Sequence, residues 1–340
     1  GGLSRRFVKI NELRAEGIDP LILDAGDLFF STPKLSKVNH ESEMFRASAI
    51  LQGYETIGCD AINIGHFEML GGLPFLKEMD TQFEIPFVSA NIRDAITNEL
   101  LFDPYVIKNK NGLEIGIIGV TDKVPDTSKT ILADNYIEAG QHYIQEIKNK
   151  VDVIVMLVNS DRQSYSNLPE NFAEADFIVT SGSTNMTRPN TSQKEGGPFL
   201  YSCGKQGKYL SVLNLDIKDA NKQFVDISSH ESNIISINKR LTRLQKKDPD
   251  KPLKEIYAQQ ANVLKLINQY ESDLNVSKAA IKSAANTLKF ETIALNKKIQ
   301  DNKELLSFVD ESLATCNSLI PKISTTIKRD QKKKRKPKKT

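Results

Sequence analysis

The sequence predicts an α/β fold, because short apolar runs alternate with helix-like stretches along its first two thirds. Each run has the length of a strand, and polar residues follow it directly. The runs lie at 21–23, 61–64, 87–90, 115–120, 153–158 and 177–179, with helical stretches at 5–16, 43–57 and 138–150. Segments 201–208 and 210–217 read as closing strands. In such folds, chemistry is placed just beyond the carboxyl ends of the strands.

Length and composition set broad limits on the protein. The chain has 340 residues, 39% of them apolar and 26% charged, which is ordinary for a soluble protein and leaves room for a domain and an extension. The sequence contains no run of 18 or more apolar residues, so it predicts no transmembrane helix. The cysteines Cys59, Cys203 and Cys316 form no CxxC pair, so neither a zinc knuckle nor a haem attachment site is indicated. The chain starts at Gly1 and reads as a truncated sequence.

The pattern changes after residue 230. Segment 231–252 reads as a linker, because it ends in a charged, proline-containing stretch at 246–252. From Leu253 onward a 3-4 spacing of apolar residues continues without glycine or proline up to Pro321. This heptad pattern predicts a long coiled-coil-like helix over 253–327. Pairing between two chains and folding back as a hairpin are both open.

The last segment, 328–340, is almost entirely basic or polar. Such a charge run is typical of a disordered, solvated tail. The alternative interpretation is contact with an anionic partner, namely a polymer, lipid headgroups or nucleic acid, driven by the release of counterions. No recognised nucleic-acid module accompanies it, so sequence-specific readout is not expected.

Six spaced blocks carry a resemblance. Residues 1–6 read GGLSRR and lead into LDAGDLF at 23–29. Further blocks follow in order at 58–65 (GCDAINIG), 89–92 (SANI), 112–121 (GLEIGIIGVT) and 151–154 (VDVI). Together they resemble the 5′-nucleotidase and 2′,3′-cyclic phosphodiesterase family of calcineurin-like metallophosphoesterases, over roughly residues 1–218. The resemblance implies a metallophosphoesterase domain over 1–230, a β-sandwich flanked by helices. Its first strand, which carries a D-x-H pair, is missing from this chain.

The resemblance also implies an activity. Family members hydrolyse phosphate esters, nucleotides among them, with a pair of divalent metals such as zinc, manganese, magnesium or iron. The metals polarise the phosphate and activate a bridging water, and a nearby histidine assists the leaving group. Most members are exported, so the resemblance implies a periplasmic or secreted location. The family's second, nucleotide-binding domain is not recognisable here, because the heptad region takes its place.

The family's ligand positions are only partly kept. Asp27 matches the bridging aspartate of LDAGD. The family's GNHEFD motif falls on 65–70, which places His66 at a ligand position and puts Phe67 and Leu70 where the catalytic histidine and its partner aspartate would stand. Neither replacement can move a proton. A shift of one residue would instead make His66 the catalytic histidine, although Glu68 favours the alignment without a gap.

The later ligand positions have changed as well. Asn159 stands where the family has a histidine at the end of a strand, and Gly182 and Thr184 occupy the two histidine positions of a GHxH turn. The resemblance therefore leaves Asp27, His66 and Asn159 as metal-ligand candidates and no intact catalytic residue. Each candidate also has a local interpretation, as a turn cap, a turn histidine or a strand-end hydrogen-bonding residue. Two hypotheses follow: a weakened or inactive phosphate-ester hydrolase, and a non-catalytic scaffold that oligomerises through its helical region.

Overall fold

A computed structural model describes residues 2–30, 32–125, 129–189, 191, 193–194, 196–204, 206–219 and 222–321. The basic segment 328–340 and the end of the predicted helix at 322–327 lie outside these residues. The helices are α1 (Leu3–Ala15), α2 (His40–Ile57), α3 (Gly72–Gln82), α4 (Tyr136–Ile147), α5 (Leu168–Asn171), α6 (Ile227–Gln245), α7 (Leu253–Ile256), α8 (Ala261–Ser283) and α9 (Lys303–Ser318). Short 3₁₀ turns occur at Glu68–Gly71 and Arg162–Ser164.

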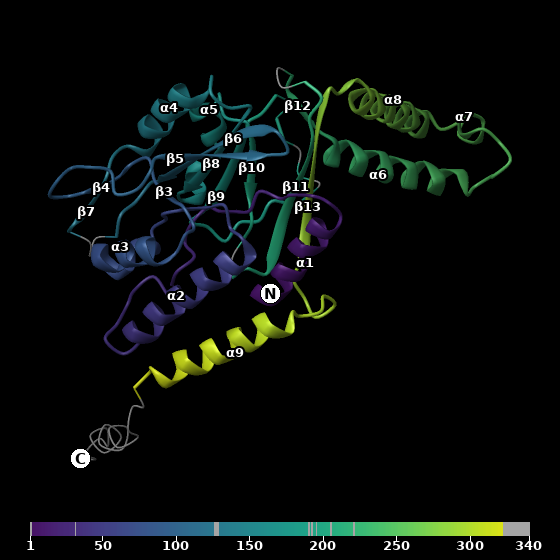
Figure 1. The fold of residues 1–340 in the computed structure, drawn as a ribbon. Coiled ribbons are helices and arrows are strands. Elements are labelled where there is room, and N and C mark those ends of the chain that lie inside the picture. The colour runs from purple at the N-terminus through teal and green to yellow at the C-terminus, as the bar shows by residue number, and fades with distance from the viewer. Residues whose placement is uncertain are drawn as a thin grey trace, which may run out of the picture.

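Strands alternate with these helices, as Figure 1 shows. They are β1 (Leu23–Asp24), β2 (Ala61–Asn63), β3 (Phe87–Val88), β4 (Ile92–Asp94), β5 (Tyr105–Lys110), β6 (Leu113–Thr121), β7 (Ile131–Ala133), β8 (Val153–Asn159), β9 (Phe177–Ser181), β10 (Phe199–Ser202), β11 (Tyr209–Asp216), β12 (Phe224–Asp226) and β13 (Asn286–Ala294). The predicted α/β class is therefore confirmed.

Two sheets form the centre of the domain. One has the order β1-β2-β3 and is parallel, and the other has the order β10-β9-β8-β6-β5, in which only β5 runs antiparallel. Their facing side chains share one apolar core, which includes Ala61, Val88, Ile117 and Leu157. A second core packs α2 and α3 on the outside of the first sheet, and a third packs α4 and α5 on the outside of the other. The result is a β-sandwich flanked by helices.

The carboxyl ends of the parallel strands β1, β2, β6, β8 and β9 lie along the same edge, because these strands run in the same direction within their sheets. The register fixes this arrangement, since Thr121 at the end of β6 pairs with Asn159 of β8, which pairs in turn with Ser181 of β9. The polar residues expected to form the site follow these strand ends.

The C-terminal third differs from the predicted long helix. Strand β13 interrupts the range 253–327 and forms the middle of a three-stranded sheet, β11-β13-β12. Leu288 and Phe290 of β13 are buried in the core shared by the sheets. The heptad interpretation was wrong here because the alternation of buried Asn286, Leu288 and Phe290 has a period of two residues, which is the period of a strand.

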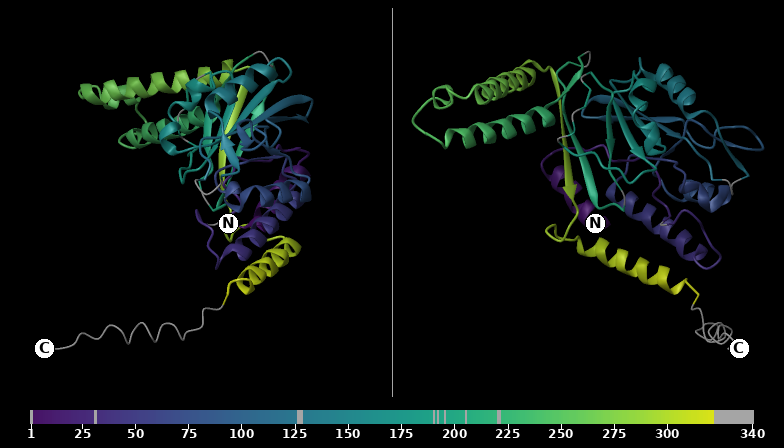
Figure 2. Two further views of the ribbon diagram at one scale, coloured as in Figure 1. Left: turned by 90° about the vertical axis from the view of Figure 1, so that its left-hand side faces the viewer. Right: turned by 180° about the vertical axis from the view of Figure 1, so that it is seen from behind.

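The other C-terminal helices fold in two places. Helices α6 and α8 pack side by side as a hairpin that stands off the sandwich, and the range 231–252, expected to be a linker, is helical as far as Gln245. Helix α9 packs on α2 and α1 at another side of the molecule, as the two further views in Figure 2 show. Asp301, just before α9, accepts hydrogen bonds from Ser4 and Arg5 of α1. No helix within the described ranges is long and apolar enough to cross a membrane.

Candidate active site at the strand ends

Glu68 joins the loops that follow β1 and β2. Its side chain is completely buried, and its two carboxylate oxygens accept four backbone N–H groups at 2.5–3.1 Å. Three of these donors, Asp27, Leu28 and Phe29, lie after β1, and the fourth, Gly65, lies after β2. The Glu68 carboxylate therefore fixes one loop against the other by satisfying N–H groups that would otherwise be buried without acceptors.

Asp27 completes this connection from the opposite direction. Its Oδ1 accepts a hydrogen bond from the backbone N–H of Phe67 at 2.9 Å, while its own N–H donates to Glu68. The backbone of Asp27 is left-handed, with φ of 64°, a conformation that aspartate tolerates better than most residues. Asp27 thus lies just beyond the end of β1, and one of its carboxylate oxygens holds the loop that follows β2.

Two carboxylates lie close together in this connection, and the pKa of Glu68 reflects it. Burial is the main cause that raises the pKa of Glu68 above its ordinary value, and the negative charge of Asp27 raises it further. The backbone N–H groups of Asp27 and Leu28 act in the opposite direction, because hydrogen bonds to a carboxylate favour its ionised form. A buried acid surrounded by backbone donors is suited to holding loops in place.

Asn159 links three strand ends through its side-chain amide. Its Oδ1 accepts from the backbone N–H of His66 at 3.1 Å, and its Nδ2 donates to Ser181 Oγ at 2.7 Å. The Ser181 hydroxyl in turn donates to the carbonyl oxygen of Ala25, in the loop after β1. Both ends of the Asn159 amide are therefore engaged in hydrogen bonds within the protein.

His66 is half-buried at the same edge. Its Nδ1 lies 3.3 Å from the carbonyl oxygen of Lys123, in the segment after β6. The Lys123 ammonium group forms an exposed ion pair with Asp161, which follows β8. The structure thus brings Asp27, His66 and Asn159 to one strand-end edge, connected through the backbone N–H groups of His66 and Phe67.

The substituted family positions have become part of the structure around this edge. Phe67 lies with its ring centroid 6.0 Å from that of His66, and Leu70 packs against the core beneath α2 and α3. Gly182 has φ of 85°, and a Cβ atom at this position would lie 2.6 Å from the carbonyl oxygen of Ser160. Only glycine fits that turn without displacing backbone. Thr184 is exposed beyond it.

These residues do not assemble a metal centre by themselves. Among the residues that the structure describes, no three His, Cys, Asp or Glu side chains are grouped to hold a metal ion. The hydrogen bonds of the candidate ligands agree with this absence. The amide oxygen of Asn159 accepts from the His66 N–H, and one carboxylate oxygen of Asp27 accepts from the Phe67 N–H. The described residues therefore do not fit the family's two-metal site.

A buried polar chain supports the turn after β1 from behind. The Arg6 guanidinium donates to the Tyr54 hydroxyl, which donates to Asp24 Oδ2 at 2.8 Å, and Asp24 Oδ1 accepts from Gly26 N–H at 3.0 Å. Burial raises the pKa of both Asp24 and Tyr54. The chain extends from α1 through α2 to the glycine that precedes Asp27.

Sequence reasoning gave no role to Glu68, Ser181 or Asp24. The signal for Glu68 was an acidic residue between the apolar Phe67 and Met69 in a motif position, where an acid must find buried partners. The signal for Asp24 was its place at the end of β1, two residues before a glycine. Ser181 carried no signal of its own, because its role depends on the pairing of β8 with β9.

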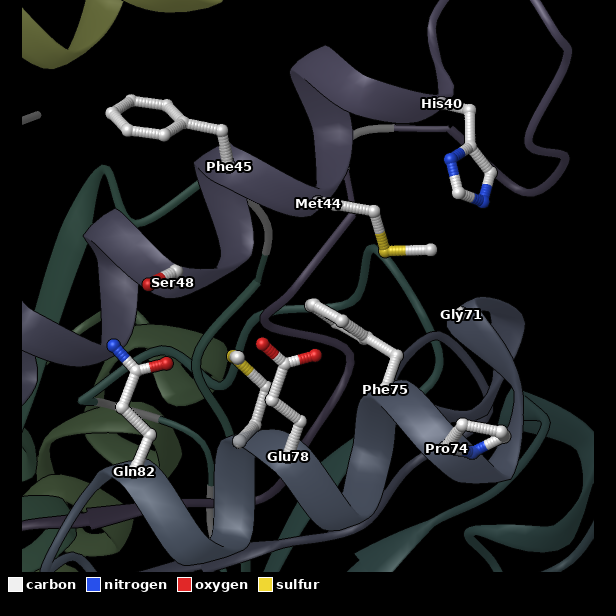
Figure 3. A pocket seen from close by; sticks show the side chains of 10 residues that line it. His40, Met44, Phe45, Ser48, Gly71, Pro74, Phe75, Glu78 and Gln82 are labelled. Carbon is white, nitrogen blue, oxygen red and sulfur yellow. The ribbon is translucent and has the colours of Figure 1, made fainter.

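A cavity of about 510 Å³ lies between α2 and α3, away from these residues. Figure 3 shows Met44 of α2 and Phe75 of α3 extending toward one another across it, with His40 near one end and Gln82 near the other. None of the candidate site residues lines this cavity. It is therefore a separate feature of the helical layer, and the candidate site remains at the strand ends.

The chain is similar in sequence to known 5′-nucleotidases. No protein-family model matches the chain. A 5′-nucleotidase of Vibrio cholerae is 27% identical over 279 residues, which cover 70% of this chain and 48% of the relative. A snake venom 5′-nucleotidase of Gloydius brevicauda is 29% identical over 280 residues, covering 72% of this chain and 44% of the relative. The chain thus spans about half the length of these relatives.

Solved structures show the same fold. The calcineurin-like phosphoesterase YfkN of Bacillus subtilis superposes with a TM-score of 0.62 at 16% identity, covering 94% of this chain and 91% of the other. At that coverage, the likeness in fold extends beyond the motif-bearing residues 1–218 into the C-terminal part. The chain is thus similar in sequence to 5′-nucleotidases and in fold to calcineurin-like phosphoesterases, and both findings support the resemblance to the 5′-nucleotidase family that the motif blocks indicate.

Proposed function

We propose that this chain is a 5′-nucleotidase-type phosphoesterase domain in which metal-dependent hydrolysis of nucleotide phosphate esters is weakened or lost. The observation that carries the proposal is Asn159, whose amide holds the His66 backbone at one end and Ser181 at the other. At a position where the resemblance implies a metal ligand, the side chain instead connects strand ends.

The replaced residues support the same proposal. Phe67 and Leu70 provide no group that transfers a proton, and a general acid or base typically contributes about 10²–10⁴ in rate. Gly182 sits in a turn that has no space for a histidine side chain. The structure keeps the connection between Asp27 and Glu68, so the loops hold their shape without the family's proton-transfer residues.

A hydrolase assay tests this proposal. The full chain is incubated with adenosine 5′-monophosphate or p-nitrophenyl phosphate in the presence of manganese, zinc or magnesium, beside an Asp27→Ala variant. We expect no release of phosphate above that of the variant. Metal-dependent turnover that disappears in Asp27→Ala would show that the site is catalytic, with any further ligands supplied from outside the described residues.

Assembly is the second candidate function. The heptad pattern indicates oligomerisation through 253–327. One feature of α9 supports this hypothesis. Leu306 and Leu313, seven residues apart, are 36% and 45% exposed on α9, so they lie close together on one outward face. Light scattering on the full chain, with Leu306→Ser and Leu313→Ser together as the variant, tests a dimer formed through this face. A monomer in both forms would contradict it.

Export is the proposed location, periplasmic or secreted, on the basis of the family resemblance alone. The described cysteines Cys59, Cys203 and Cys316 are all unpaired, and two of them are buried, so the fold does not depend on a disulfide among them. Fractionation of source cells, followed by detection of the protein with an antibody, tests the location. Recovery with cytoplasmic markers would contradict it.

A further inference from the structure

The end of the α6–α8 hairpin is a strongly basic part of the described surface that the candidate function does not use. Residues 239–254 carry seven lysine or arginine side chains and only two acidic ones, and all seven cations are exposed. They are Lys239, Arg240, Arg243, Lys246, Lys247, Lys251 and Lys254. Figure 2 shows that this hairpin end projects away from the sandwich, so its cations are accessible from outside the domain.

The hairpin has a defined geometry that orients these cations. Asn233 of α6 donates to Ser277 of α8 at 3.1 Å, and Arg240 donates to the Tyr270 hydroxyl at 3.3 Å, which sets the antiparallel register. Ile237 of α6 and Ile267 of α8 are buried between the helices. Because the helices are held in register, the cations keep fixed positions relative to one another.

Three cations form a stripe along the outer edge of α6. Lys239, Arg243 and Lys246 follow one another at spacings of four and three residues, which places them on one face over roughly 10 Å. That face lies opposite the buried Ile237, so it points away from α8. Among the described residues none of the three has an ion-pair partner, and Ile235, 69% exposed, precedes them on the same face.

The remaining cations are positioned by contacts around the hairpin end. Arg240 lies over the ring of Tyr270 and Lys247 over the ring of Tyr257, at 5.5 and 5.0 Å from the centroids. Lys251 pairs with Asp248, which neutralises one of the two acids at the hairpin end, and Lys254 pairs with Glu271. The end of the hairpin thus presents positive charge in several directions.

We propose that the end of the α6–α8 hairpin binds an anionic lipid surface. The stripe of Lys239, Arg243 and Lys246 lies on one outward face, so a plane of negative headgroups can contact all three side chains together, and each lysine or arginine near such a surface contributes attraction. Non-specific binding of single-stranded nucleic acid uses a cationic groove with aromatic rings free to stack on bases. Here Lys247 covers one face of the Tyr257 ring, which is also buried, and Arg240 covers one face of the Tyr270 ring, so neither ring is free to stack on a base from that side.

Vesicle binding tests the proposal on the full chain. The probe is vesicles of phosphatidylcholine that contain phosphatidylglycerol, compared with phosphatidylcholine alone, and the readout is co-sedimentation over a range of salt. The test variant combines Lys239→Gln, Arg243→Gln and Lys246→Gln. The matched control combines Lys297→Gln, Lys298→Gln and Lys303→Gln. These three side chains are also exposed, and they lie in the segment after β13 and at the first residue of α9, away from the hairpin.

We expect the test variant to bind anionic vesicles at least about tenfold more weakly than the unchanged chain, because each cation near a charged surface is worth about fivefold in binding. The control should change binding by less than about twofold, and salt should weaken binding of the unchanged chain. Both variants should keep the thermal unfolding midpoint, since all six side chains are exposed.

Three results would overturn the proposal. One is an equal loss in both variants, which would reflect net charge alone. Another is vesicle binding that the test variant leaves unchanged, which would assign binding to another part of the chain. The third is binding of a DNA oligonucleotide that depends on Lys239, Arg243 and Lys246 without any binding of anionic vesicles, which would assign the surface to nucleic acid.

Discussion

The two halves of the strand-end edge have diverged to different degrees. On the side of β1 and β2, Asp27 and Glu68 join the two loops through reciprocal hydrogen bonds, and both match the motif positions of the family resemblance. On the side of β8 and β9, Asn159 and Gly182 stand where the resemblance implies histidines, and Ser181 connects the strand ends to Ala25. In the function proposed above, the residues that hold the loops are kept, Asp27 among them, while the positions where the resemblance implies histidines are exchanged.

The largest effect is expected from the retained half. Replacing Glu68 by alanine leaves four backbone N–H groups without their buried acceptor, and we expect it to lower the free energy of unfolding by roughly 3–5 kcal/mol. Urea unfolding followed by circular dichroism measures this. Glu68→Gln, which keeps an acceptor oxygen, should lose less. A loss below about 1 kcal/mol in Glu68→Ala would mean that water replaces the carboxylate at little cost.

The turn at Gly182 offers the next test, because it restores the residue type that the resemblance implies. Gly182→His places a side chain at φ of 85° and within 2.6 Å of the Ser160 carbonyl. We expect a loss of about 2–4 kcal/mol in the free energy of unfolding. The neighbouring Thr184→His, at an exposed position, serves as the matched control and should be nearly neutral. Equal stability of the two variants would show that this turn still accommodates a ligand.

Asn159 tests the cross-linking in the exchanged half directly. Asn159→Ala removes the acceptor for His66 N–H and the donor to Ser181, and we expect it to cost about 1–3 kcal/mol, measured by the same unfolding experiment. The double variant with Ser181→Ala should cost less than the sum of the two single changes, since the two side chains share a hydrogen bond. Strict additivity would contradict the proposed connection.

The smallest effect is expected at the exposed rim of the same edge. Lys123 and Asp161 form an ion pair in which both side chains are more than half exposed. Lys123→Ala should change the free energy of unfolding by no more than about 0.5 kcal/mol, because solvent screens such pairs. A larger loss would contradict this expectation and would show that the pair stabilises the edge more than solvent screening allows.

The sequence predicted the α/β class well, because its strands are apolar runs that end in polar residues and its helices fill the intervals. The prediction of one long helix was wrong at β13, where buried and less buried residues alternate but no glycine or proline marks the change of period. The buried residues are Asn286, Leu288 and Phe290, and they alternate with Thr287, Lys289 and Glu291. A strand that pairs with β11, some 75 residues earlier in the chain, is specified by that distant partner more than by its own pattern.

The candidate site was predictable in its positions and less so in its roles. Asp27, His66 and Asn159 do lie at one edge, as the motif spacing indicated, since parallel strands bring their carboxyl ends together. Asn159 connects strand ends because Ser181 and the backbone of His66 lie within hydrogen-bonding distance of its amide. The sequence around Asn159 does not indicate the position of either partner. The role of Glu68 likewise depends on four N–H groups from two loops.

Metal binding tests most directly whether the side chains at the strand ends hold the loops together or hold a metal ion. The full chain and an Asp27→Asn variant are each incubated with manganese or zinc, desalted, and analysed for metal per chain by plasma mass spectrometry. We expect both to retain far less than one ion per chain and not to differ, because the strand-end side chains are engaged in hydrogen bonds within the protein. Retention of one or two ions per chain by the unchanged protein, lost in Asp27→Asn, would contradict it.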